Sequence, residues 1–254
     1  MQFKEFMLFY RKGRNSLKIY FDVHTHTTAS GHAYSSLEEN IRVAKEKGLT
    51  YYGVSDHAPM MPGSTHLFYF QNLKVLPRQM YGVNILRGVE ANIIDEDGRI
   101  DMLPTGLEHI DYVIASLHPP CINYGTIEAN TNAIIGAMKN PRVNIIGHPD
   151  DSRYPLDYEK IVKAAKEYKV MLEINNSSLT PGSFRDGAKE NIQMMLKSAK
   201  KYNVPVILSS DAHVSNDVGN LEYAIQAIED AEFPEELVIN TNVELFLNYI
   251  ALRY

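Results

Sequence analysis

The stretch IYFDVHTH (residues 19–26) joins an apolar, β-branched run to two histidines, and it decides the fold assignment because similar runs recur along the chain. They are TYYGVS, VNILRGV, DYVIAS, RVNIIG, VMLEIN and VPVILSS, with a weaker one, LVINT, near the end. Each has the length and composition of a buried β-strand. Helical periodicity fills stretches between them, at residues 37–47, 158–168, 188–202 and 221–228. This alternation predicts parallel strands linked by crossover helices.

The number of strands favours a barrel. Seven clear strands and a weaker eighth fit a closed or distorted β/α barrel of the TIM type better than an open doubly wound sheet, which stays as the alternative. No GxGxxG motif follows the first strand to indicate dinucleotide binding. No linker rich in Gly, Ser or Pro divides the chain, so a single α/β domain is the simpler interpretation. Residues 1–18 are expected to form an N-terminal extension.

Composition excludes several classes of protein. The 254 residues are 44% hydrophobic, which supplies a sizeable core, and the formal net charge of −6 without basic runs argues against long nucleic acids or an anionic membrane as partners. Cys121 is the lone cysteine, so no internal disulfide can form, and no apolar run has the length of a membrane span. The start, MQFKEFMLFYRKGRNSLK, is a poor signal peptide because its basic residues follow its apolar stretch. We expect a cytoplasmic protein.

Residues that bind metals gather at the ends of the predicted strands. His24 and His26 are two positions apart after the first strand, so both side chains point to the same face. Other strands are followed by Asp56 and His57, by Glu90, by His118, by His148, and by Asp211 with His213. In six of the seven clear strands the residue stands at the carboxyl end, where barrel enzymes place their chemistry. The pattern predicts one polynuclear site rather than scattered histidines.

Three further histidines lie outside the strand ends. His32 is in the loop after the first strand, and Gly31 beside it lets the backbone fold back over the site. His66 and His109 are expected to be structural or exposed, although a role for His66 facing the site stays open. Cys121 is expected to pack under its loop as a bystander.

The number and type of these residues indicate the metals. Seven histidines with Glu90 and Asp211 are too many for one zinc ion, which takes about four ligands, so two or three ions are implied. Mixed imidazole and carboxylate ligands suit zinc, manganese or iron rather than calcium or magnesium. Asp56 either orients His57 or holds the turn.

Taken together, HTH, SDHA, GVEANI, SLHPP, GHPD and SSDAH resemble the motifs of the PHP (polymerase and histidinol phosphatase) superfamily, most closely its stand-alone YcdX-type phosphatases. The resemblance also covers EINNSS and runs from about Asp22 to the C-terminus, with no ligand position substituted. It implies that residues 19–254 form a single PHP-type domain, a distorted barrel of seven β/α units that holds three metal ions.

The resemblance also implies which residues bind which ion. One metal would take His24, His26, Glu90 and Asp211, a second His32, His57 and His213, and a third His118 and His148, with Glu90 bridging. Zinc is the expected metal, with manganese or iron as alternatives. Glu90, Asp211 and His213 are the candidate catalytic residues.

Three divalent ions would leave the site positively charged and therefore suited to phosphate. The main prediction is a phosphatase that hydrolyses small phosphomonoesters with a hydroxide bridging two metals. Arg185, in SLTPGSFRDGAKEN, and Arg153 are candidate phosphate clamps, because a guanidinium can hold two phosphate oxygens. The alternative for Arg185 is a solvated side chain or a local pair with Asp186.

Other functions remain as competitors. A nuclease or phosphodiesterase acting on nucleotides or nucleic-acid ends is the nearest chemically. An amidohydrolase also opens with HxH, but the place of its bridging lysine on the fourth strand is held here by His118. A non-catalytic metal protein is disfavoured because structural zinc sites are closed and rich in Cys, whereas two of the three sites here would have three protein ligands.

Overall fold

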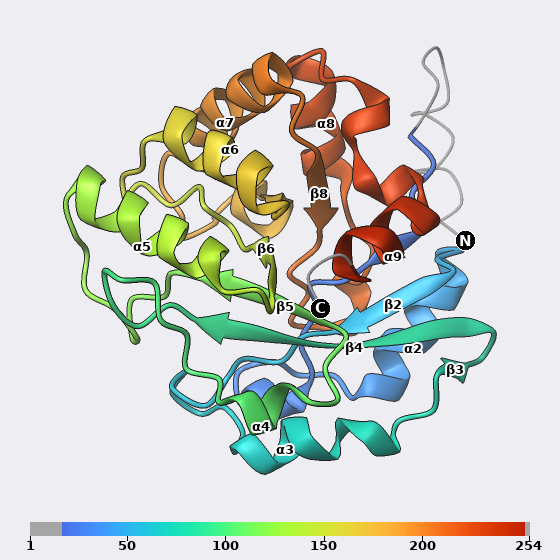
Figure 1. The fold of residues 1–254 in the computed structure, drawn as a ribbon. Coiled ribbons are helices and arrows are strands. Elements are labelled where there is room, and N and C mark those ends of the chain that lie inside the picture. Colours follow the sequence, from blue (N-terminus) through green and yellow to red (C-terminus); the bar gives the residue numbers. More distant parts are fainter. Residues whose placement is uncertain (1–16, 252–254) are drawn as a thin grey trace.

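The computed structural model describes residues 17–251, in which seven parallel strands curl into a nearly closed barrel surrounded by helices (Figure 1). The strands are β1 (Phe21–Asp22), β2 (Tyr51–Val54), β4 (Val83–Asn92), β5 (Tyr112–Ser116), β6 (Val143–Ile146), β7 (Met171–Asn175) and β8 (Val206–Ser209). They are paired in that order, and the short β3 (Gln79–Met80) lies antiparallel to β4. The distorted TIM-like barrel is thereby confirmed. Of the expected extension, residues 1–16 lie outside the described part.

Helices cover the outside of the barrel. They are α2 (Leu37–Glu46), α3 (Leu67–Asn72), α4 (Pro104–Leu107), α5 (Ile127–Lys139), α6 (Tyr158–Tyr168), α7 (Ala188–Tyr202), α8 (Glu222–Asp230) and α9 (Val243–Ala251). Short 3₁₀ helices are η1 (Thr28–Ser30), η2 (Leu73–Val75), η3 (Ser177–Leu179), η4 (Ser215–Asp217), η5 (Glu235–Leu237) and η6 (Ile239–Thr241). The helices α5, α6 and α7 pack in a row, as the right-handed crossovers between β5 and β8 require. None of the helices in residues 17–251 has the length and apolar character to cross a bilayer.

The barrel closes at a seam between β1 and β8. Beyond the strand ends, His26 N donates to Ala212 O at 2.8 Å and Asp211 N donates to His24 O at 2.9 Å. The residues that close the carboxyl end of the seam are therefore predicted metal ligands or their immediate neighbours.

The weak eighth strand predicted at LVINT is wrong, because these residues form parts of η5 and η6, and Val238 between them makes only an isolated parallel bridge to Val206 of β8. The Asn240 side chain makes the seam contacts instead. Its Oδ1 accepts from Leu208 N at 2.7 Å, while its Nδ2 donates to Leu208 O at 2.8 Å and to Phe21 O at 3.1 Å. One buried amide thus bonds both edge strands, which a regular strand would do through its backbone.

The barrel interior is filled by Tyr112. Its hydroxyl donates to Val23 O at 2.6 Å, and its ring occupies space that Gly53 and Gly88 leave free. A Cβ atom would stand 2.3 Å from the tyrosine oxygen at Gly53, and 2.2 Å from Cζ at Gly88. These two glycines are therefore required by packing.

The helix α9 closes one end of the barrel. Phe246 packs on Phe21 of β1 with ring centroids 4.5 Å apart, and Ile250 joins the same cluster. This cluster includes the first residues of β1, β5 and β7. Because α9 covers the amino-terminal ends of the strands, the carboxyl-terminal ends form the open mouth.

Candidate metal centre

Glu90, at the carboxyl end of β4, stands in the middle of the predicted ligands and is fully buried. Its Oε1 lies 3.3 Å from Nε2 of His24, 3.2 Å from Nε2 of His118 and 2.9 Å from Nε2 of His148. Its Oε2 lies 3.5 Å from His26 Nε2 and 2.7 Å from His57 Nδ1. One carboxylate thus reaches five histidines that come from four different segments of the chain, since His24 and His26 both follow β1.

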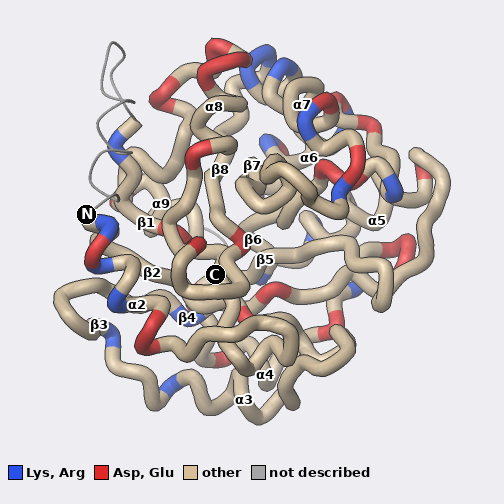
Figure 2. Tube along the Cα trace, turned by 180° about the vertical axis from the view of Figure 1, so that it is seen from behind, with Lys and Arg blue, Asp and Glu red and all other residues tan. Residues whose placement is uncertain are grey.

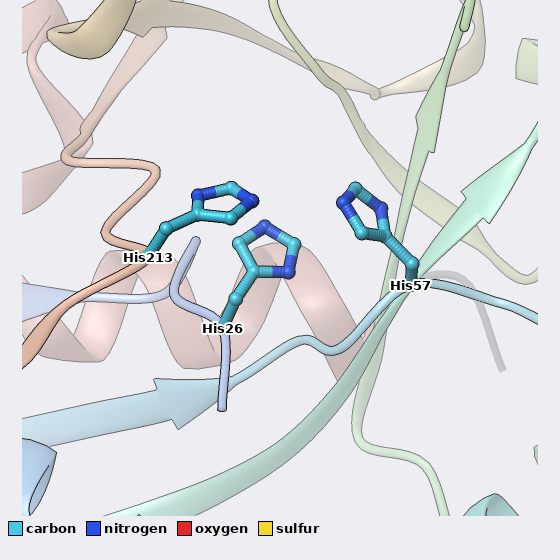
Figure 3. Close-up of side chains that lie close together, drawn as sticks. All are labelled: His26, His57 and His213. Carbon is cyan, nitrogen blue, oxygen red and sulfur yellow. The ribbon is translucent and has the colours of Figure 1, made fainter. Parts of the chain in front are cut away.

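The remaining ligands surround His26. Asp211 Oδ1 lies 3.2 Å from His26 Nε2, and the His26 ring is centred 4.2 Å from that of His213 and 4.3 Å from that of His57. Figure 3 shows these three rings converging from the loops after β1, β2 and β8. His32 joins from the first loop, with its Nε2 3.2 Å from His57 Nε2. The structure therefore brings all nine predicted ligands into one cluster.

Four buried ligand atoms in this cluster make no hydrogen bond of normal geometry: His24 Nε2, His26 Nε2, His57 Nδ1 and Glu90 Oε2. The last two lie 2.7 Å apart, so they contact each other without a well-directed hydrogen bond. Buried polar atoms without partners are costly, whereas metal ions would satisfy all four. In the described residues, groups of three with ligand atoms within 4.8 Å of one another are His26, His57 and His213; His24, His148 and Asp211; His24, His26 and Glu90; and His57, Glu90 and His118. The donor set fits divalent transition metals.

The electrostatics also suit cation binding. Burial opposes ionisation of Glu90, but the neighbouring His24, His118 and His57 outweigh it and hold its pKa well below the usual range. Burial likewise opposes ionisation of Asp211, but the neighbouring His24 and His26 outweigh it and hold the pKa of Asp211 well below the usual range. Both carboxylates are therefore ionised, as metal ligands must be.

The two histidines of the HTH motif differ in charge. Burial, with His213 and His57 nearby, holds the pKa of His26 well below its usual range, so this ring is neutral and ready to bind. Burial also disfavours a charged His24, but Glu173, Glu90 and Asp211 outweigh it and raise the pKa of His24 well above its usual range. Metal binding at His24 must therefore displace a proton.

The strand β7 carries no predicted ligand, yet two of its buried side chains hold ligands from other strands. Glu173 Oε1 lies 2.7 Å from His24 Nδ1, and Glu173 Oε2 accepts from His148 N at 2.6 Å. Asn175 Nδ2 donates to Asp211 Oδ2 at 3.2 Å. Sequence reasoning missed Glu173 and Asn175. Their signal was present as polar residues two positions apart, hence on one face, within the apolar run VMLEIN.

Two of the predicted ligands have strained backbones. His148 (φ 27°) and Asp211 (φ 56°) both lie in the left-handed region, which side chains other than Gly rarely adopt. Each is held there by hydrogen bonds, His148 N to Glu173 and Asp211 N to His24 O. Strain of this kind clusters at functional sites.

Asp56 holds the turn after β1, which is one of the two roles expected for it, the other being to orient His57. It accepts hydrogen bonds from Thr27 N at 2.7 Å, Ser30 Oγ at 2.7 Å and Tyr69 Oη at 2.6 Å, which holds the turn after β1. Ser30 Oγ in turn lies 3.0 Å from His26 Nδ1. Asp56 therefore fixes a predicted ligand, His26, through Ser30.

The residues expected to be bystanders lie apart from the cluster. His66 is exposed and caps α3, where its ring accepts a hydrogen bond from Phe68 N. His109 lines a separate surface cavity beside α3 and α4. Cys121 is half-buried, and burial raises the pKa of its thiol to about 12, so it stays protonated. Gly31 adopts φ 79°, which brings the loop carrying His32 back over the site as expected.

Both candidate clamps line a cleft of about 670 Å³ above the cluster. Arg185 is buried, with Nη1 and Nη2 each 3.2 Å from Asp211 Oδ2. It is therefore not a solvated side chain, and its ionic partner is Asp211 rather than Asp186. Arg153 binds Asp151 through Nε and Nη2, and its guanidinium lies 5.3 Å from the centroid of the Phe184 ring.

The chain is similar to several known proteins. The chain is 49% identical over 240 residues to a probable phosphatase of Caldanaerobacter subterraneus, covering 94% of both chains. It is 52% identical over 236 residues to a probable phosphatase of Thermoanaerobacter, covering 92% of this chain and 95% of the relative. A solved structure with a similar fold is histidinol phosphate phosphatase from Lactococcus lactis in complex with zinc, L-histidinol and phosphate (TM-score 0.59, 19% identity, 85% and 94% coverage). Residues 22–177 match the PHP domain, and the chain therefore belongs to the PHP family.

Proposed function

We propose that the protein is a metal-dependent phosphatase that hydrolyses small phosphomonoesters at a centre of three divalent transition-metal ions. The observation that carries the proposal is the convergence of seven imidazoles and two carboxylates, with unpartnered ligand atoms, beneath an open cleft that also holds Arg185. The names of the relatives and the zinc and phosphate in the Lactococcus lactis structure support it. Zinc is the preferred metal, with manganese or iron as alternatives.

The proposed ligand sets follow the contacts of the cluster. They are His24, His26, Glu90 and Asp211 for one ion, His32, His57 and His213 for a second, and His118 and His148 with bridging Glu90 for a third. When bound, such ions would act as Lewis acids that offset phosphoryl charge and lower the pKa of water.

The protein side chains of the site have separate tasks. Glu90 places one negative charge between the imidazoles and, through its two oxygens, serves more than one ligand set. Asp211 directs Oδ1 toward His24 and His26, while Arg185 and Asn175 hold Oδ2. His213 Nδ1 lies 2.9 Å from Asp211 O, which leaves its other nitrogen available at the cleft. Glu90, Asp211 and His213 are thus the proposed catalytic residues.

Arg185 and Arg153 are the proposed phosphate-binding groups. Of the two arginines, Arg185 is the one that directly contacts a proposed ligand, Asp211. A guanidinium that spans a ligand carboxylate and a phosphate oxygen would fix the substrate relative to the metals. Arg153 stands farther up the cleft wall, beside Phe184, and retains N–H groups beyond those used by Asp151.

The proposal is tested by metal analysis and a substrate panel. Purified protein, loaded with zinc or manganese and freed of excess metal, is expected to hold close to three ions per chain and to hydrolyse 4-nitrophenyl phosphate faster than bis(4-nitrophenyl) phosphate. Faster cleavage of the diester would favour the phosphodiesterase alternative. Long nucleic acids are disfavoured as substrates because Lys and Arg are interspersed with Asp and Glu along the chain (Figure 2). Full metal content without hydrolysis of any ester or amide would indicate metal storage.

A further inference from the structure

The walls of the cleft above the ligand cluster are largely apolar. They include Pro62, Pro119, Pro120 and Phe184, all of which are exposed, whereas the predicted metal ligands form the floor. Phe184 is 66% exposed and stands in the lining of the cleft. An exposed aromatic ring at the rim of a cleft offers a flat surface to a ligand.

The cations that line the cleft are already paired. Apart from the histidines of the floor, the basic residues that line it are Arg153 and Arg185, and they are bound to Asp151 and Asp211. Under the proposed function, both arginines also bind the phosphate group that is cleaved. Apart from these two ion pairs and the histidines, the cleft lining has one more charged residue, Asp217, which is exposed. The cleft lining therefore combines an exposed carboxylate with an apolar surface, and it holds no lysine and no arginine beyond the two that are paired.

A neighbouring cavity continues this arrangement. It has a volume of about 450 Å³ and shares Pro119 and Pro120 with the cleft, so the two prolines form a ridge between the two spaces. Its lining includes Glu96 and also Asp95, which is paired with Arg99, and it contains no lysine or arginine. A substrate that extended over the ridge would meet further negative charge, which disfavours a second phosphate or carboxylate.

We propose that the cleft selects phosphomonoesters whose leaving group is uncharged and presents an apolar, preferably planar, face to Phe184, and that it rejects substrates with a second anionic group. This inference rests on the proposed phosphatase function and specifies its substrate class. Selection comes from two sources: contact with Phe184 and the proline ridge favours the apolar group, and Asp217 with Glu96 repels an additional anion.

A matched pair of substrates tests the charge selectivity. Phenyl phosphate and 4-carboxyphenyl phosphate have the same ring and differ in one carboxylate. We expect kcat/KM to be lower for the carboxylate by about tenfold or more, because like charges brought together are costly. A binding measurement avoids turnover: phenylphosphonate should bind the metal-loaded enzyme more tightly than 4-phosphonobenzoate in calorimetry. Equal or reversed preference in both measurements overturns the proposed selectivity.

The role of Phe184 is tested by substitution with a matched control. Phe184→Ala should lower kcat/KM for phenyl phosphate by about tenfold and leave 2-glycerophosphate nearly unchanged, because only the aromatic leaving group loses its contact. Phe184→Tyr keeps the aromatic ring, so it should restore the wild-type preference for phenyl phosphate over 2-glycerophosphate. Phe68→Ala is the control, since Phe68 is 67% exposed on α3 and does not line the cleft.

The outcomes separate this inference from the proposed function. If Phe184→Ala slows both substrates equally, the ring acts on Arg153 or Arg185, whose guanidinium groups lie 5.3 and 5.0 Å from its centroid, and the specificity role is wrong. If wild-type enzyme hydrolyses phosphomonoesters but prefers a bisphosphate, only the substrate class is wrong. If metal-loaded protein hydrolyses no phosphomonoester, the proposed function itself fails, while the phosphonate binding comparison still tests the cleft.

Discussion

His24 Nδ1 lies 2.7 Å from Glu173 Oε1, and both side chains are fully buried. The carboxylate fixes a proton on Nδ1, so Nε2 is left facing Glu90 and Asp211 as a ligand atom. The second oxygen of Glu173 accepts from His148 N, and His148 belongs to a different proposed ligand set. One side chain therefore orients residues of two proposed metal sites at once.

Glu173→Gln should lower metal affinity by about 10–100-fold, because the amide keeps the shape of the side chain but loses the charge that orients His24 and holds His148. The measurement is competition with a chromophoric chelator, with the number of ions counted by elemental analysis. Glu167→Gln, on the exposed face of α6, provides the control for loss of a carboxylate. Wild-type metal affinity in Glu173→Gln would rule out the orienting role.

Glu90→Ala should be more harmful than removal of any single histidine. The substitution removes a ligand from two proposed ion sites and leaves five imidazoles without the negative charge between them. Metal content and turnover of 4-nitrophenyl phosphate should both fall below those of His32→Ala. A Glu90→Ala protein with full metal content and wild-type turnover would contradict the bridging role.

Arg185→Lys keeps the charge and loses the planar fork, so kcat/KM should fall by the equivalent of about 1–3 kcal/mol while metal content stays unchanged. For Arg185→Ala, kcat/KM should fall further. Because Arg185 also contacts Asp211, metal content is the deciding control. Loss of metal in both variants would make Arg185 a positioning residue for Asp211, and unaltered kinetics in both would leave phosphate binding to the metals.

Gly53→Ala should destabilise the protein by about 1–3 kcal/mol, because the new methyl group overlaps the Tyr112 hydroxyl inside the barrel. Tyr112→Phe removes that oxygen and should relieve part of the cost, so the double variant should be more stable than the sum of the two changes predicts. Urea denaturation of the four proteins measures this. Strict additivity would show that the two positions do not share the space.

Removal of metal should lower thermal stability. Ions that bind the folded cluster at about 100 times their dissociation constant add about 3 kcal/mol, which corresponds to a melting shift of about 5–10 °C for a chain of this size. Calorimetry before and after treatment with a chelator gives the shift, and added zinc should restore it. An unchanged melting temperature would mean that the cluster binds metal weakly or not at all.

The candidate ligands could be found from the sequence because each follows a strand, and parallel strands bring their carboxyl ends together. The contacts that orient them were harder to foresee. Glu173 lies within an apolar run, where a charged residue indicates a buried partner but does not identify it. Arg185 pairs with Asp211, 26 positions away, rather than with the adjacent Asp186, because the loop after β7 folds inward over the strand ends. Such pairings depend on tertiary structure and are not visible in local pattern.

For the fold too, regular local patterns predicted the elements correctly, whereas elements that depend on tertiary contacts were missed. The helices predicted at 158–168 and 188–202 match α6 and α7, since a regular apolar stripe is a strong local signal. LVINT has the composition of a strand, yet Asn240 bonds β1 and β8 through its side chain and the backbone turns into 3₁₀ helices. The antiparallel β3 was missed because two residues carry no periodicity.

The seam of the barrel joins the first strand of the fold to the last through backbone bonds at His24, His26, Asp211 and Ala212. Asp211 and His213 therefore reach the cluster only when β8 has docked, late in synthesis. A chain that stops before β8 would still carry most of the histidines but would lack both the closing bonds and the second carboxylate. Such a fragment could hold neither the complete set of ions nor a closed barrel. Activity therefore requires a chain that extends at least through β8 and His213, and chains that end before β8 should be inert.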